Sequence, residues 1–205
     1  MKRKLVAVLL ALSVASLAGC GQKDAGDQKD AGGNSTATEE QVVDLGAPED
    51  VLNKIWETYT EDNKFAAMGG DFEHAADGMA GAFDLAKTED MESLLGLPQD
   101  QAGNVTQVAS LMHAMNANTF TGACYRLAEG VDVQAFANAI KENLLAKQWM
   151  CGIPDKVVMY QIQDSYLITA FGSAQAVDYF KTQTTENLEG VELVCEEGIS
   201  ADAAQ

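Results

Sequence analysis

The chain has 205 residues, of which 47% are hydrophobic, so it is long and apolar enough to bury a core and is not disordered throughout. It carries 31 acidic and only 13 basic residues, a formal net charge of −18 at pH 7. A body this acidic is repelled by nucleic acid, which we exclude as a partner, while cations and basic partners remain compatible with its charge.

The first 19 residues have the organisation of a signal peptide. Residues 2–4 form a basic tip, and the apolar run 5–18 is too short to cross a bilayer core of roughly 30 Å as a helix. The run ends in Leu17-Ala18-Gly19-Cys20, which matches the tetrapeptide at which bacterial lipoproteins are acylated and cleaved. We therefore predict that Cys20 carries the lipid and anchors the chain in the cell membrane, on its extracytoplasmic face.

Residues 20–47 are expected to form a disordered tether behind the lipidated cysteine. Most of this stretch is polar and rich in glycine, and it contains the unit QKDAG twice, at 22–26 and 28–32. Such a composition offers too little apolar area to offset the entropy of ordering the chain. A single α+β domain is predicted over residues 48–198, followed by a frayed tail at 199–205.

The first part of the domain is predicted to be helical. Pro48 suits the first position of a helix, which the apolar spacing extends to about residue 63. Residues 65–83 resemble a long surface loop. Thr88 then begins a short helix, which Gly96 closes.

The rest of the domain is predicted to alternate hairpins with helices. Residues 107–113 are compatible with a strand or a helix, and we favour a strand because a turn and a β-rich run at 119–127 follow. A helix from Asp132 to about residue 148 leads to strands at 156–163 and 165–171. Ser173 caps a last helix, and a strand follows at 191–195. This order predicts an α+β fold, a mainly antiparallel sheet with helices packed on one face, preceded by an N-terminal helical segment.

Three cysteines remain once Cys20 is set aside. No Cys-x-x-Cys motif is present, which disfavours a thioredoxin-type redox site. The predicted elements place Cys124 too far from Cys151 for a disulfide, whereas Cys195 could pair with either one. Free, buried thiols are our main interpretation, and a disulfide involving Cys195 stays open.

No catalytic residues, metal site or cofactor are predicted. The acidic loop contains Asp71, Glu73, His74 and Asp77, but their spacing matches neither a calcium-binding EF-hand nor a zinc motif. Hydrolase and nucleotide-binding signatures are missing from the sequence.

Two apolar stretches are candidates for a partner-binding surface. Phe65, Met68 and Phe72 lie in the flexible, glycine-containing loop, where they could form a binding lip. Trp149 lies at the exit of a helix, where an aromatic side chain can anchor a partner. The alternative for all four residues is packing at the edge of the core.

Three segments also resemble a known group of proteins. Residues 68–72 (MGGDF), 111–120 (LMHAMNANTF) and 148–152 (QWMCG) are similar to parts of Gram-positive lipoproteins, some of which are labelled bacteriocin transport accessory proteins. The later half also resembles a broader family of small lipoproteins of unknown function. The resemblance implies an exported lipoprotein and supplies no catalytic residues.

We therefore expect a membrane-anchored lipoprotein with a non-enzymatic binding or export-accessory role, whose domain binds either a membrane or secreted protein or a small ligand. The alternative is a thiol- or metal-dependent extracytoplasmic enzyme.

Overall fold

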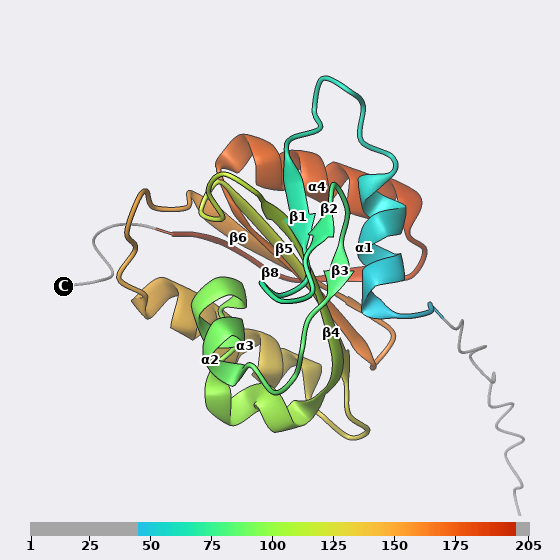
Figure 1. Cartoon of the computed structure of the whole chain (residues 1–205). Coiled ribbons are helices and arrows are strands. Elements are labelled where there is room, and N and C mark those ends of the chain that lie inside the picture. Colours follow the sequence, from blue (N-terminus) through green and yellow to red (C-terminus); the bar gives the residue numbers. More distant parts are fainter. Residues whose placement is uncertain (1–44, 200–205) are drawn as a thin grey trace, which may run out of the picture. The chain divides into compact units, whose positions relative to one another are not determined.

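A computed structural model of the chain describes residues 45–199 (Figure 1). The predicted signal peptide, Cys20, the tether up to residue 44 and the tail from residue 200 lie outside the described residues. The elements in chain order are α1 (Pro48–Trp56), β1 (Ala67–Gly69), β2 (Ala76–Asp77), β3 (Gly81–Ala82), α2 (Thr88–Asp90), the π-helical η1 (Met91–Leu95), the 3-10 helix η2 (Gln99–Asn104), β4 (Val105–His113), β5 (Phe120–Leu127), α3 (Val133–Ala146), β6 (Lys156–Ile162), β7 (Tyr166–Gly172), α4 (Ala174–Asn187) and β8 (Val191–Gly198).

The strands form one antiparallel sheet in the order β2-β1-β4-β5-β7-β6-β8, and β3 also pairs with β4. Two long hairpins, β4–β5 and β6–β7, lie side by side because β5 pairs with β7. The predicted α+β class with a mainly antiparallel sheet is therefore confirmed. The residues that were ambiguous between strand and helix belong to β4.

The helices cover both faces of the sheet, so the prediction that they pack on one face is wrong. Helices α1 and α4 pack on one face, against side chains such as Phe120 and Ile168 (Figure 1). Helix α3 and η1 pack on the other face, against alternate residues of the same strands such as Tyr125 and Leu167. The sheet thus separates two hydrophobic cores.

The chain path explains this arrangement. Helix α3 connects β5 to β6, and α4 connects β7 to β8, so both connections move toward the β8 edge of the sheet. Connections between parallel strands of one sheet are nearly always right-handed. The two connections start from β5 and β7, which run in opposite directions. Two right-handed connections that move toward the same edge from antiparallel strands place their helices on opposite faces of the sheet.

The N-terminal half of the domain differs from the prediction in two further respects. Helix α1 ends at Trp56 and not near residue 63 as predicted. Just beyond its end the Thr58 hydroxyl donates to the carbonyl of Ile55 at 2.6 Å, and this bond competes with the backbone hydrogen bonds that would continue the helix. The predicted loop 65–83 contains the short strands β1, β2 and β3, which extend the sheet beyond β4.

The folded part is slightly longer than predicted at both ends. Leu45 packs against the core, and the Tyr166 hydroxyl donates to the carbonyl of Gly46 at 2.7 Å. At the other end Ile199 is buried, and its N–H donates to the carbonyl of Asp155 at 2.9 Å. Residues 45–47 and 199 therefore belong to the domain rather than to the tether and the tail.

The outer strands of the sheet are β2 and β8. Strand β2 has only two residues. Strand β8 pairs with β6 through a register shift opposite Met159 and Tyr160, and it carries Glu192, Glu196 and Glu197.

Candidate functional site

The four residues predicted as a partner surface do not form one surface. Phe65 is half-buried, and its ring packs 4.8 Å from Trp56 and 5.2 Å from Phe120 on the α1 side of the sheet. Met68 is half-buried in β1. Phe72 is 66% exposed in the connection between β1 and β2.

Trp149 lies on the opposite face from Phe65. Its ring packs 5.5 Å from Phe171, against the core on the α3 side. The Lys147 ammonium group lies 4.5 Å from the centre of the indole ring. This ring therefore contributes to packing, while the residues that follow it in the chain are exposed.

Asp71 is the centre of a polar cluster that folds the acidic segment. Its side chain is 1% exposed and accepts hydrogen bonds from the N–H groups of Glu73 (2.9 Å), His74 (3.1 Å) and Asp84 (3.1 Å). The Lys87 ammonium group donates to the same carboxylate at 3.0 Å. One buried charge thus ties together residues from 71 to 87.

These bonds also set the ionisation of Asp71. Burial opposes the charged form, but the hydrogen bonds from Lys87, from His74 and from the two backbone N–H groups of Glu73 and Asp84 outweigh it and hold the pKa of this carboxyl well below its ordinary value. The donors occupy the oxygens that a metal ion would need. Within residues 45–199 no three His, Cys, Asp or Glu side chains converge as a metal-binding group.

Two loops meet at one end of the sheet and form the surface that sequence reasoning missed. The first loop, residues 114–119, joins β4 to β5, and the second, residues 147–155, joins α3 to β6. The Asn118 side chain donates to the carbonyls of Met150 (2.7 Å) and Gly152 (2.8 Å). The Asn116 side chain donates to the carbonyl of Cys151 at 3.2 Å. We call the exposed face of these two loops the two-loop surface.

The two-loop surface exposes three large apolar side chains to solvent. Met115 is 83% exposed, Met150 79% and Ile153 46%. Neighbouring Cys151 is exposed and has a φ angle of 63°, in the left-handed region that non-glycine residues rarely occupy. The asparagine bonds hold this backbone in place while the apolar side chains point to solvent.

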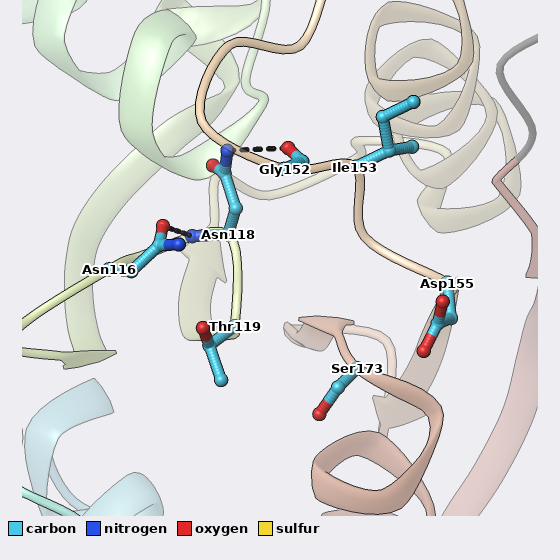
Figure 2. A pocket seen from close by; sticks show the side chains of 7 residues that line it. All are labelled: Asn116, Asn118, Thr119, Gly152, Ile153, Asp155 and Ser173. Carbon is cyan, nitrogen blue, oxygen red and sulfur yellow. Dashed lines mark hydrogen bonds between the residues drawn. The ribbon is translucent and has the colours of Figure 1, made fainter.

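A polar cavity of about 130 Å³ opens beside these loops (Figure 2). The residues that line it are Asn116, Asn118, Thr119, Gly152, Ile153, Asp155 and Ser173. Its walls are fixed by backbone bonds, since Ser173 N–H donates to the Thr119 carbonyl at 2.9 Å and Asp155 N–H to the Gly172 carbonyl at 2.8 Å. Asp155 also accepts from Ala174 N–H at 2.7 Å, at the start of α4.

The sequence contained only indirect signs of this cavity. Asn116 and Asn118 were interpreted as turn residues and Ser173 as a helix cap. The cap is confirmed, because the Ser173 hydroxyl accepts from Ala176 N–H. Nothing in the linear sequence indicates that positions 118, 155 and 173 lie around one space.

The three cysteines between residues 45 and 199 are free thiols. Cys124 is buried in β5, and burial raises the pKa of its thiol, which is the opposite of what a reactive thiolate needs. Cys195 lies on β8, three strands away from β5, a separation of roughly 14 Å at the usual strand spacing. A disulfide between Cys124 and Cys195 is therefore excluded.

None of the helices between residues 45 and 199 combines the length and the apolar character needed to cross a membrane. Comparison of the chain with protein-family models, with curated proteins and with solved structures found no match in any of the three.

Proposed function

We propose that the chain is an extracytoplasmic lipoprotein that is anchored in the cell membrane through acylated Cys20 and binds a membrane or secreted protein, as an accessory in export. The observation that carries the anchoring is the sequence Leu17-Ala18-Gly19-Cys20 behind a basic tip and a short apolar run. Two or three acyl chains hold a protein on a membrane stably. The resemblance of three segments to Gram-positive lipoproteins supports the same location.

The two-loop surface supports the binding role. Three large apolar side chains, those of Met115, Met150 and Ile153, are exposed on two loops that hydrogen bonds hold together. Methionine adapts its shape to different partners, and exposed apolar patches mark sites of interaction. A rigid backbone that presents such side chains suits the binding of a partner with apolar contacts.

The anchor is tested by a serine substitution. In the bacterium that expresses the intact chain, Cys20→Ser should abolish incorporation of a palmitate analogue and release the protein from the membrane fraction. Cys151→Ser, which changes an exposed cysteine of the domain, serves as the control and should leave both unchanged. Acylation that persists in Cys20→Ser would contradict the proposed anchor.

The binding role is tested by placing a photo-crosslinking residue at position 150 of the membrane-bound protein. A crosslinker at position 79 is the control, because Met79 is also exposed, at 48%, but lies between β2 and β3. We expect one discrete crosslinked protein from position 150 and not from position 79. Identical products from both positions would contradict a specific role of the two-loop surface.

A further inference from the structure

The histidine at the end of β4 connects the core to the two-loop surface. His113 is half-buried, and its ring stacks on that of Phe65, with the ring centres 5.2 Å apart and the planes inclined by 20°. The Nδ1 atom of His113 accepts hydrogen bonds from the backbone N–H groups of Met115 (3.2 Å) and Asn116 (3.4 Å). The ring therefore links Phe65, at the edge of the core, to the backbone of the first loop.

The two N–H groups belong to residues on which the two-loop surface depends. Met115 is 83% exposed and is one of the three apolar side chains of this surface. The Asn116 side-chain oxygen accepts from Asn118 N–H at 3.0 Å, and its NH₂ group donates to the carbonyl of Cys151 at 3.2 Å (Figure 2). A change in the backbone at residues 115 and 116 is thus passed to the second loop, which carries Met150.

The bonds at Nδ1 specify the protonation state of the ring. An imidazole nitrogen accepts a hydrogen bond only when it carries no proton, so these bonds require a neutral His113 with its proton on Nε2. In the imidazolium form Nδ1 becomes a donor, and it would then face the N–H groups of Met115 and Asn116. Donors that face one another lose their hydrogen bonds, so the first loop must move when the ring is protonated.

The charged groups around His113 do not offset this effect through an ion pair. Strand β1, which pairs with the end of β4 at Ala67 and His113, contains no charged residue. In the segment before β1, Lys64 is paired with Glu61 at 3.3 Å. Among residues 45–199 no acidic side chain forms an ion pair with His113 that would favour its charged form.

The other histidine of the chain has the opposite environment. The Nδ1 atom of His74 lies 3.1 Å from a carboxylate oxygen of Asp71, and the His74 side chain is 67% exposed. Protonation of His74 keeps this contact and adds a charge that the carboxylate favours. Because the whole sequence contains only these two histidines, their responses to acid can be separated by substitution.

We infer that neutral His113 positions the two-loop surface and that protonation of its ring releases the surface, so that partner binding weakens below about pH 6. The sign follows from the bonds at Nδ1, because the ordered loop excludes a proton that the released loop accepts. This inference rests on the proposed binding role and names how that role is regulated.

The first test measures hydrogen exchange of the Met115 and Asn116 N–H groups by NMR, with the full-length chain in detergent. The rates are corrected for the intrinsic effect of pH on exchange. Imidazole ordinarily titrates near pH 6.5, so at about pH 5.5 proton binding to the released loop favours opening by up to about tenfold. The protection of both groups should therefore fall severalfold, toward that limit, between about pH 7.5 and about pH 5.5.

Three variants separate the ring nitrogen from other effects of acid. His113→Asn places an oxygen near the position of Nδ1 that accepts hydrogen bonds and does not titrate, so protection should be the same at both pH values. His113→Leu has no acceptor and should show low protection at both. His74→Asn is the matched control and should respond to acid as the unchanged protein does.

Four results would overturn the inference. These are equal protection at both pH values in the unchanged protein, an acid response that persists in His113→Asn, a response that disappears in His74→Asn, and a neutral His113 ring with its proton on Nδ1. The last is read from the ring-nitrogen chemical shifts of the unchanged protein, so it decides the matter even if the variants fail to fold.

The crosslinker at position 150 distinguishes a failure of this inference from a failure of the proposed function. The yield of the crosslinked protein should be lower at about pH 5.5 than at about pH 7.5, and equal at both in His113→Asn. A yield that does not depend on pH in the unchanged protein leaves the binding role standing and refutes its control by His113. If no specific protein is crosslinked at either pH while hydrogen exchange responds as expected, the binding role fails and the positioning of the loop by His113 stands.

Discussion

Replacing Asp71 by asparagine should destabilise the segment from residue 71 to residue 87. The structure allows us to estimate the loss in the free energy of unfolding. The carboxylate is 1% exposed and accepts from three backbone N–H groups and from Lys87. In Asp71→Asn one oxygen becomes an NH₂ group that faces these donors. Breaking a buried ion pair costs about 3–5 kcal/mol. Because Lys87 retains Glu73 as a partner at 3.2 Å, we expect the lower end, about 3 kcal/mol in the free energy of unfolding at pH 7.

The pH dependence gives this prediction a second, independent signature. The pKa of Asp71 is lower in the folded state than its value of about 3.9 in the unfolded chain. The unfolded chain therefore binds more protons between the two values, so the stabilisation is fully present above about pH 4 and is lost as the pH falls toward the folded pKa. The difference in stability between the unchanged protein and Asp71→Asn should stay constant above about pH 5 and narrow as the pH falls from about 4 to 3.

Urea unfolding followed by tryptophan fluorescence measures both quantities. Trp56 is a suitable reporter because its indole N–H donates at 2.8 Å to the carbonyl of Gly78, within the segment that Asp71 organises. Asp62→Asn, which changes an exposed acid in a turn, is the control and should alter stability by less than about 0.5 kcal/mol. A loss below about 1 kcal/mol in Asp71→Asn, or a difference that does not change with pH, would refute the reasoning.

Two further predictions concern the strand ends and the thiols. Gly172→Ala should lower the free energy of unfolding by at least about 2 kcal/mol in a urea titration, because its φ is +153° and a Cβ atom would lie 2.2 Å from the Thr119 carbonyl oxygen. Gly130→Ala, whose φ is also positive but whose Cβ would meet nothing within 4 Å, should cost clearly less, and equal losses would contradict the steric argument. Alkylation of the folded chain followed by mass spectrometry should modify exposed Cys151 first and buried Cys124 only on unfolding. Modification of both at the same rate would contradict the buried position of β5.

The regular part of the fold was predictable because each element carries its own local signal. Asp132 and Ser173 cap α3 and α4 as predicted, with side-chain oxygens that accept from Ala135 and Ala176. The hairpin β6–β7 also begins and ends within one residue of the predicted positions. Short strands gave no such signal, because two or three residues cannot display an alternating pattern. Gly69 and Gly81 instead indicate close backbone approach, since a Cβ on Gly69 would lie 2.2 Å from the nitrogen of Gly81.

The covering of both sheet faces could have been predicted, and the cavity could not. Residues 157–160 and 166–171 are almost continuously apolar, whereas a sheet with one solvated face alternates apolar and polar residues. Together with the handedness of the two connections, that pattern indicates two cores. The cavity, in contrast, joins Asn118, Asp155 and Ser173, which come from separate loops whose approach depends on the tertiary packing.

The outer strands of the sheet have a consequence for how copies of the chain behave when they are crowded. A sheet edge is a template on which a second molecule can add a strand and begin aggregation. Here β2, with two residues, is too short to serve as such a template. Strand β8 is irregular, because its pairing with β6 contains a register shift, and it carries three glutamates. Two copies that met edge to edge would bring these like charges together. Many molecules held side by side should therefore remain separate instead of growing into fibres.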